Sequence, residues 1–110
     1  MYFYALRWDN DEGMELFFHD AAYDRLEVDP TYSHGLPASV VERYRSRLQL
    51  LRGAHAEHDL TAMQCLRFRS VETRSGCFSV HLTDQYSLIV ELRRHSPVML
   101  SIVEVQIHRA

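Results

Sequence analysis

The sequence predicts a small α+β domain in which two N-terminal helices pack on a mainly antiparallel sheet. Its 110 residues, 46% of them hydrophobic, are enough for one compact core and too few for two independent ones. Hydrophobic residues recur at helical spacing in residues 37–53. They change toward alternation in the second half, which is rich in Val, Ile, Phe and Tyr. Helices followed by a run of strands are typical of an α+β arrangement.

The first elements are short. Residues 1–13 begin with an aromatic apolar run and end in acidic and turn-prone residues, so we treat them as an N-terminal extension, either an added strand or a misassigned start. The segment ELFFH at residues 15–19 is typical of a buried strand. A helix over residues 20–28 follows, with Asp20 as its cap, and Asp29 and Pro30 end it.

The helix at residues 37–53 has the clearest pattern in the chain. Pro37 suits a first helical position and Gly53 suits a stop. Arginines occupy the other faces. The expected core stripe consists of Val40, Val41, Tyr44, Leu48 and Leu51.

The sequence of the second half of the chain predicts strands. After a polar connector at residues 54–63, short strands are expected at residues 66–68, 77–82, 86–92 and 99–108. Turn-forming residues at 83–85 and 95–97 separate the last three, which predicts an antiparallel meander. The helices should cover one face of this sheet and leave the other face partly open.

Charge and cysteine content exclude several classes of protein. The net charge of −3 disfavours a protein that binds nucleic acid by its overall charge. Residues 1–34 carry two basic and eight acidic residues, 2 − 8 = −6, which leaves +3 for residues 35–110. Cys65 and Cys77 form neither a disulfide framework nor a zinc motif, and no apolar run is long enough for a membrane span or a secretion signal. We therefore expect a cytoplasmic protein with no membrane partner.

Residues 14–110 resemble the HigB-like branch of the RelE/ParE superfamily of toxins, also called plasmid maintenance killer proteins. The hairpin motif L-x-D-Q-aromatic-x-L-I-V, here Leu82–Val90, is the most specific piece. The other matching pieces, in order along the chain, are ELFFHDAAYDRLE, GLPASVVERYRSRLQLLR, DLTAMQCLRF and IVEVQIH.

The resemblance implies a RelE-like fold and the toxin of a type II toxin–antitoxin system. Such toxins inhibit translation as ribosome-dependent mRNA endoribonucleases, or mRNA interferases. The implied partners are a helix-turn-helix antitoxin of the HigA kind, the ribosome and mRNA, with operator DNA contacted only through the antitoxin. Histidine and arginine suffice for this cleavage, so we expect neither a metal nor another cofactor. His55 and His58 lack the further ligands that a metal site needs.

Site residues follow from the positions that match the family. His108 aligns with the histidine that ends the family's Asp-Tyr-His triplet, and it is the expected proton-transfer residue. His81 lies on the polar face of its strand, and we group it and Arg67 with His108 as catalytic. The expected RNA-binding residues are Arg69, Arg74, Tyr86 and Gln106.

The chain also departs from the family. Gln106 and Ile107 replace the Asp-Tyr of the terminal triplet, and His81 and Ser87 replace two arginines of the hairpin. These losses motivate two alternatives. One is a catalytically degenerate RelE-fold module that binds its antitoxin and helps operator repression; the other is a ParE-like gyrase inhibitor.

Overall fold

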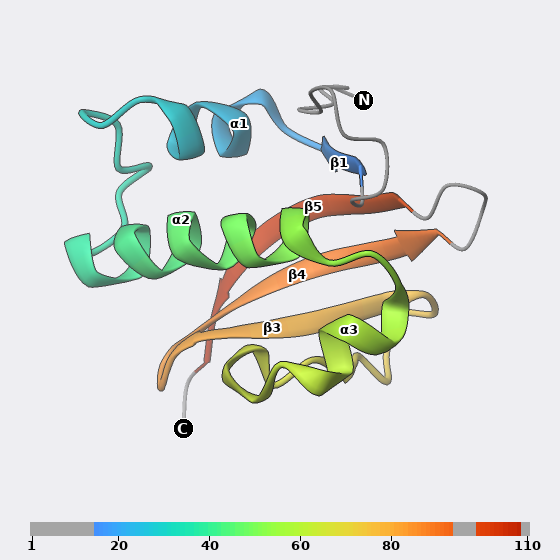
Figure 1. Cartoon of the computed structure of the whole chain (residues 1–110). Coiled ribbons are helices and arrows are strands. Elements are labelled where there is room, and N and C mark those ends of the chain that lie inside the picture. Colours follow the sequence, from blue (N-terminus) through green and yellow to red (C-terminus); the bar gives the residue numbers. More distant parts are fainter. Residues whose placement is uncertain (1–14, 94–98, 109–110) are drawn as a thin grey trace.

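The computed structural model of the chain describes residues 15–93 and 99–108 and shows an α+β domain (Figure 1). The expected extension at residues 1–13 and the expected turn at residues 95–97 lie outside the described residues. In chain order the elements are β1 (Glu15–Phe18), α1 (Ala21–Val28), α2 (Ala38–Gly53), α3 (Glu57–Ala62), the 3-10 turn η1 (Gln64–Leu66), β2 (Arg69–Ser70), β3 (Cys77–Thr83), β4 (Tyr86–Arg93) and β5 (Met99–Ile107).

The described strands form one mixed sheet in the order β1-β5-β4-β3-β2. The neighbours β3, β4 and β5 pair antiparallel, which confirms the predicted meander. β1 pairs with β5 in parallel, with Leu16 opposite Leu100 and Phe18 opposite Ile102. This parallel pair makes the sheet mixed. The four residues of β1 do not show by their own pattern which strand they pair with or in which direction.

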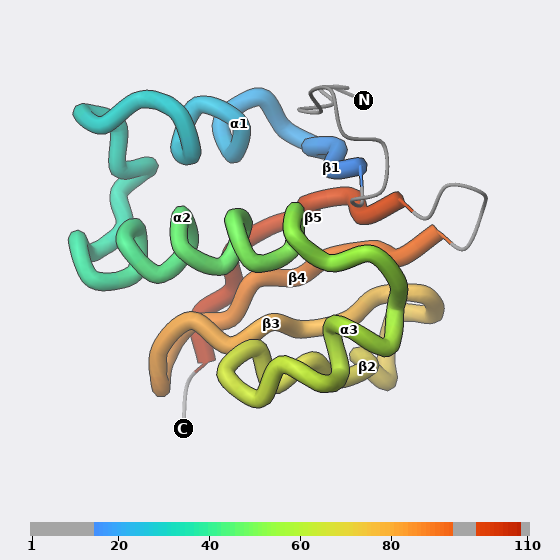
Figure 2. The backbone as a smooth tube through the Cα atoms, viewed as in Figure 1, coloured from blue at the N-terminus to red at the C-terminus, as the bar shows by residue number. Residues whose placement is uncertain are grey.

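The two longer helices form where capping and apolar spacing predict them. The Asp20 carboxylate accepts a hydrogen bond from the Ala22 amide at 2.9 Å and caps α1, which ends at Val28 as expected. The stripe of α2 is buried as predicted. Figure 2 shows the path of the backbone from α1 through the loop into α2. The hydroxyl of Tyr44 on that stripe donates to the Tyr23 carbonyl at 2.7 Å and so joins the two helices.

The core lies between the helices and one face of the sheet. Alternate residues of the strands point into it, because successive side chains of a strand point to opposite faces. The fully buried strand residues of this cluster are Leu16, Phe18, Val80, Leu82, Leu88, Val90, Leu100 and Ile102. The residues between them face the other side of the sheet, and α2 lies against β3 on the core side (Figure 1).

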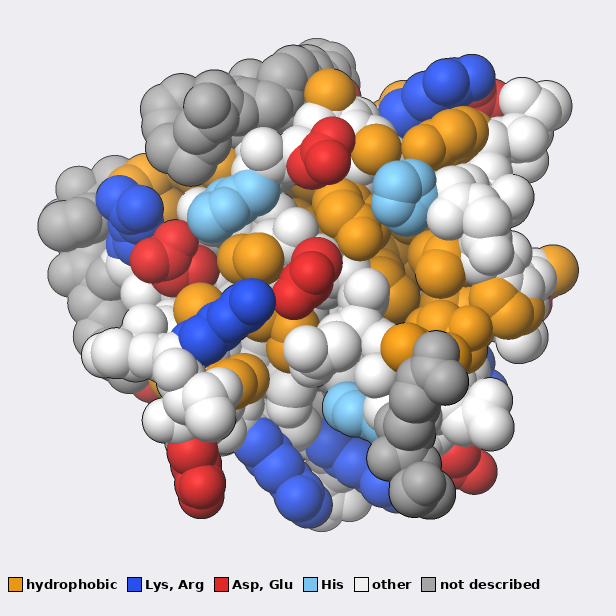
Figure 3. All heavy atoms as spheres, turned by 180° about the vertical axis from the view of Figure 1, so that it is seen from behind, with side chains coloured by type: hydrophobic (Ala, Val, Ile, Leu, Met, Phe, Trp, Pro, Cys, Tyr) orange, Lys and Arg blue, Asp and Glu red, His pale blue; other side chains and the backbone are white. Residues whose placement is uncertain are grey.

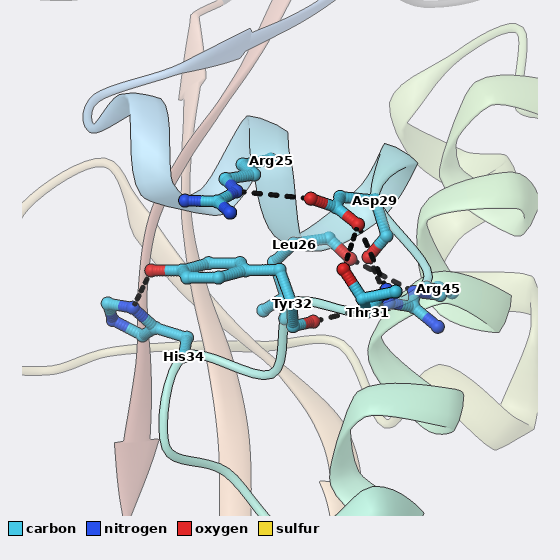
Figure 4. A network of polar contacts seen from close by, with 7 residues as sticks. All are labelled: Arg25, Leu26, Asp29, Thr31, Tyr32, His34 and Arg45. Atoms are coloured by element: carbon cyan, nitrogen blue, oxygen red, sulfur yellow. Dashed lines mark hydrogen bonds and ion pairs between the residues drawn. The ribbon is translucent and has the colours of Figure 1, made fainter.

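The loop between α1 and α2 is fixed by arginines (Figure 4). Arg45 of α2 donates to the carbonyls of Leu26 and Asp29, each at 2.9 Å. The Arg25 guanidinium lies 4.3 Å from the centre of the Tyr32 ring. These contacts hold the end of α1 against α2.

Two predictions for the middle of the chain are wrong. The expected connector contains the short helix α3, because the Asp59 carboxylate accepts from the amides of His55 and Ala56 and the Leu60 side chain is buried. The strand expected at residues 66–68 is absent. The turn η1 ends there instead, and Arg67 adopts a left-handed conformation with φ of 45°.

None of the helices in residues 15–93 and 99–108 has both the length and the apolar character needed to cross a membrane.

Candidate functional site

A polar pocket of about 240 Å³ opens on the face of the sheet opposite the helices. Figure 3 looks onto this face, and in its lower part blue arginine and pale blue histidine side chains lie close together. Four segments meet here: the end of η1, β2, the β3–β4 hairpin and the end of β5. The lining residues are Arg67, Arg69, Ser79, His81, Ser87 and His108.

The two histidines come together through a serine. His81 of β3 lies opposite Ser87 of β4 in the ladder, so their side chains are neighbours on the same face. The Ser87 Oγ and the His108 Nε2 are hydrogen-bonded at 2.5 Å. The His108 amide also donates to the Gln85 carbonyl at 2.6 Å, which ties the residue after β5 to the hairpin turn. Strand pairing therefore places His81 beside Ser87, and the hydrogen bond to Ser87 holds the His108 imidazole at the same pocket.

The two arginines enter from a short segment next to the sheet edge. Arg69 of β2 lies opposite Ser79 of β3. Between the arginines, the Phe68 ring stacks on the Phe78 ring with centroids 4.6 Å apart, which anchors the segment on the core side. The left-handed backbone at Arg67 turns the chain from η1 into β2, and it places the Arg67 guanidinium at the pocket.

The fold changes the protonation of His81. Partial burial lowers the pKa of this imidazole below its ordinary value of 6.5, and the charges of Arg67 and Arg47 lower it further, against a smaller opposing effect of Asp84. His81 is therefore neutral near pH 7 and able to accept a proton. An imidazole can transfer a proton, and guanidinium groups beside it can stabilise negative charge on a phosphate.

Among the residues that the structure describes, those that line this pocket include no carboxylate, unlike the rest of the same face. Farther along the sheet, Arg74 pairs with Glu104 at 3.4 Å, and Glu91 lies 3.5 Å from His19 and 3.6 Å from Arg93. Positive charge is thus matched by carboxylates elsewhere on this face. In the pocket it remains available for an anionic ligand.

The structure brings together four of the seven site residues expected from the sequence. Arg67, Arg69, His81 and His108 line the pocket. The other three are not among the lining residues. Arg74 pairs with Glu104, and Tyr86 packs against the core and lines a separate hollow with Pro37. Gln106 is exposed on β5 beside Ser87, at the border of the pocket.

Sequence reasoning missed Ser79 and Ser87. Both are small polar residues, and both fall on the same side as His81 when the strands alternate. A strand register would have identified them, because Ser79 pairs with Arg69 and Ser87 pairs with His81.

Within residues 15–93 and 99–108, no group of three or more His, Cys, Asp or Glu side chains has the arrangement of a metal site. His55 and His58 lie by α3, where Asp59 accepts from the His55 amide and lies 3.3 Å from the His58 ring. This cluster stabilises the start of a helix.

Comparisons with protein-family models and with curated proteins find no match to this chain. Its function is therefore inferred from the pocket and from the residues that line it.

Proposed function

We propose that this chain is a HigB-like toxin with a RelE-like fold, a ribosome-dependent endoribonuclease that cuts mRNA without a metal. The observation that carries the proposal is the pocket, which two histidines and two arginines line, with no Asp or Glu among the lining residues that the structure describes. A HigA-like helix-turn-helix antitoxin would neutralise the toxin and alone contact operator DNA. The site of action would be the ribosome in the cytoplasm.

The pocket contains the groups that cleavage at a ribose phosphate needs. In this reaction the ribose 2′-oxygen bonds to phosphorus while the bond from phosphorus to the 5′-oxygen breaks. A base takes the 2′-hydroxyl proton and an acid gives a proton to the leaving oxygen, so the products are a 2′,3′-cyclic phosphate and a 5′-hydroxyl. Neutral His81 is suited to be the base, and we assign His108 as the acid.

The arginines would stabilise the charge that develops on the phosphate. A cationic donor aimed at that charge contributes about 2–4 kcal/mol to such a transition state. Support comes from Arg67 and Arg69, which line the same pocket as the histidines. In the hairpin, His81 and Ser87 replace two arginines of the family. Arg67 and Arg69 would supply the positive charge that these replacements remove.

The net charge of −3 agrees with a ribosome-dependent enzyme. A protein that docks on ribosomal RNA through one basic surface does not need an overall positive charge, because local potential guides the encounter. The ribosome would also hold the mRNA in place and so provide the orientation that a shallow pocket does not.

The test is cleavage of a reporter mRNA in a purified translation system. His81→Ala and His108→Ala should each lower the cleavage rate by roughly 10²-fold or more, because each removes a proton-transfer group. His58→Ala is the matched control, since that side chain is exposed on α3. Equal cutting by wild type and His108→Ala would remove His108 from the mechanism.

Folded wild-type protein that leaves mRNA intact on the ribosome would contradict the nuclease. Normal growth of a bacterial host that makes this protein without antitoxin would then favour a catalytically degenerate binding module. Broken DNA with intact mRNA would favour gyrase inhibition.

A further inference from the structure

Two arginines of α2 reach the backbone of β3 at the pocket. The Arg47 Nε donates to the His81 carbonyl at 3.0 Å, and an Arg43 guanidinium nitrogen donates to the Leu82 carbonyl at 3.3 Å. Residues four positions apart lie on the same side of a helix, so the two side chains act on consecutive peptide groups of the strand. Both contacts come from the side of the molecule opposite the pocket mouth.

The strand is irregular at this point. His81 lies opposite Ser87 and Thr83 lies opposite Tyr86, so β3 advances two residues while β4 advances one. Such a bulge disrupts the hydrogen-bond ladder and changes the direction of nearby side chains. β2 pairs only with Phe78 and Ser79, so among the described strands it does not support β3 at His81. The arginines supply hydrogen bonds where the ladder is broken.

Arg47 is an unusual residue for its position. Its exposed fraction is 8%, and it lies next to Leu48 within the buried surface of α2. A buried guanidinium must recover a large desolvation cost, and an apolar side chain of similar volume often gives equal or greater stability. Core packing alone therefore does not account for an arginine here.

We propose that Arg47 is a positioning residue for the nuclease: with Arg43 it fixes the β3 backbone at the bulge and so sets the place of the His81 imidazole in the pocket. The role in catalysis rests on the proposed function. The positioning itself is a property of the fold and can be measured separately.

The same contact affects the proton equilibrium of His81. Its partial burial is the main cause of the lowered pKa, and Arg47 adds to the lowering together with Arg67 and Arg43, against Asp84. The charged and titratable groups around His81 come from α2, the end of η1, β2, the hairpin turn and the end of β5. They are Arg43, Arg47, Arg67, Arg69, Asp84 and His108.

The first test follows the His81 imidazole by NMR during a pH titration of the full chain. In Arg47→Met we expect its resonances to move and its titration midpoint to rise, because a nearby positive charge and a backbone contact are both lost. Arg47→Lys keeps the charge and one donor, so it should return the midpoint most of the way. Arg52→Met is the matched control, since Arg52 lies on the same helix but pairs with Glu27.

The second test measures kcat and KM for mRNA cleavage on the ribosome. Arg47→Met should lower kcat by roughly tenfold to hundredfold with little change in KM, because a misplaced base impairs the chemical step more than binding. Arg47→Lys should recover part of kcat. If Arg47→Met does not fold, Arg43→Met removes the neighbouring contact to the Leu82 carbonyl and gives the comparison with a smaller disturbance.

The outcomes separate the two proposals. His81 resonances and a titration midpoint that stay as in wild type in folded Arg47→Met, or in Arg43→Met where Arg47→Met does not fold, would overturn the positioning role. A wild-type chain that does not cut mRNA, with a His81 midpoint that still depends on Arg47, would overturn the nuclease and leave the positioning role intact.

Discussion

His81 shows how a single residue responds to the fold. As an exposed histidine on a strand it would titrate at its ordinary pKa of 6.5. Burial and the surrounding arginines lower that pKa, so that at neutral pH the side chain is a proton acceptor. The same shift has a consequence for stability that does not depend on catalysis.

We predict that His81 makes the domain less stable as the pH falls. Its folded pKa lies below its unfolded value, so the folded state binds a proton more weakly. Its contribution is fully present above about pH 6.5 and is lost as the pH falls through the lowered folded pKa. The free energy of unfolding in urea should therefore decrease from pH 7.5 to 5.5, and this decrease should be smaller in His81→Asn.

The exposed His58 is the control for this measurement, because His58→Asn should keep the wild-type pH dependence. The lowered pKa values of two carboxylates lie below the pH range of this measurement, 7.5 to 5.5. Hydrogen bonds from Thr31 lower the pKa of Asp29 below 3.8, and the His55 amide does the same for Asp59. An identical decrease in wild type and His81→Asn would contradict the prediction.

At the scale of elements, the segment from η1 to β2 combines a backbone requirement and a charge requirement at one residue. Arg67 has φ of 45°, a conformation that costs a residue with a Cβ about 1–2 kcal/mol. Its guanidinium lines the pocket. Two substitutions at this position separate the two roles.

Arg67→Gly should be more stable than Arg67→Ala by roughly 1 kcal/mol, because glycine adopts the left-handed conformation without a steric cost. Both variants lose the guanidinium, so both should cut mRNA more slowly than wild type. Urea unfolding and reporter cleavage measure the two effects. Equal stability of the two variants would show that the turn does not need this backbone conformation.

The sequence predicts those elements whose pattern is local. The stripe of α2, the Asp20 cap of α1 and the alternation of β3 and β4 each follow from spacing within one element. The parallel pairing of β1 with β5 was not predicted, because it depends on contacts between distant segments. The strand expected at residues 66–68 is wrong because burial of Leu66 and stacking of Phe68 override local β propensity.

The sequence likewise predicts only those parts of the site that do not depend on contacts between distant segments. His81 and His108 are chemically distinctive residues on strands that the sequence places, and the structure brings them into one pocket. Ser87 was missed because its role depends on lying between two histidines in adjacent strands. The pairing of Arg74 with Glu104 likewise joins residues far apart in the sequence, so the sequence pattern does not predict it.

At the scale of the whole molecule, charge is unevenly distributed. The chain carries −3 overall, but the described residues that line the pocket include two arginines and no carboxylate. The other cations described on this face, Arg74 and Arg93, lie beside glutamates. In the part of the chain that the structure describes, unpaired positive charge on this face is therefore local to the pocket and does not form an extended basic surface.

We predict weak binding of isolated single-stranded RNA with a shallow dependence on salt. Two phosphate contacts give a slope of about −1.4 for the logarithm of the binding constant against the logarithm of salt concentration, or roughly a sevenfold loss between about 50 and 200 mM. Fluorescence anisotropy with a short RNA measures this slope. The double variant Arg67→Ala, Arg69→Ala should bring it close to zero, whereas a slope steeper than about −4 would show that RNA contacts a larger basic surface.

The pairing of β1 with β5 determines when the domain can be completed during synthesis. Residues 15–18 leave the ribosome early, but the strand beside them in the sheet is residues 99–107, which are translated some eighty positions later. Closing such a distant contact is slow compared with forming a local hairpin. Since His108 directly follows β5, the pocket is completed in the same late step. A nascent chain therefore has an incomplete pocket until nearly all of its mRNA has been translated.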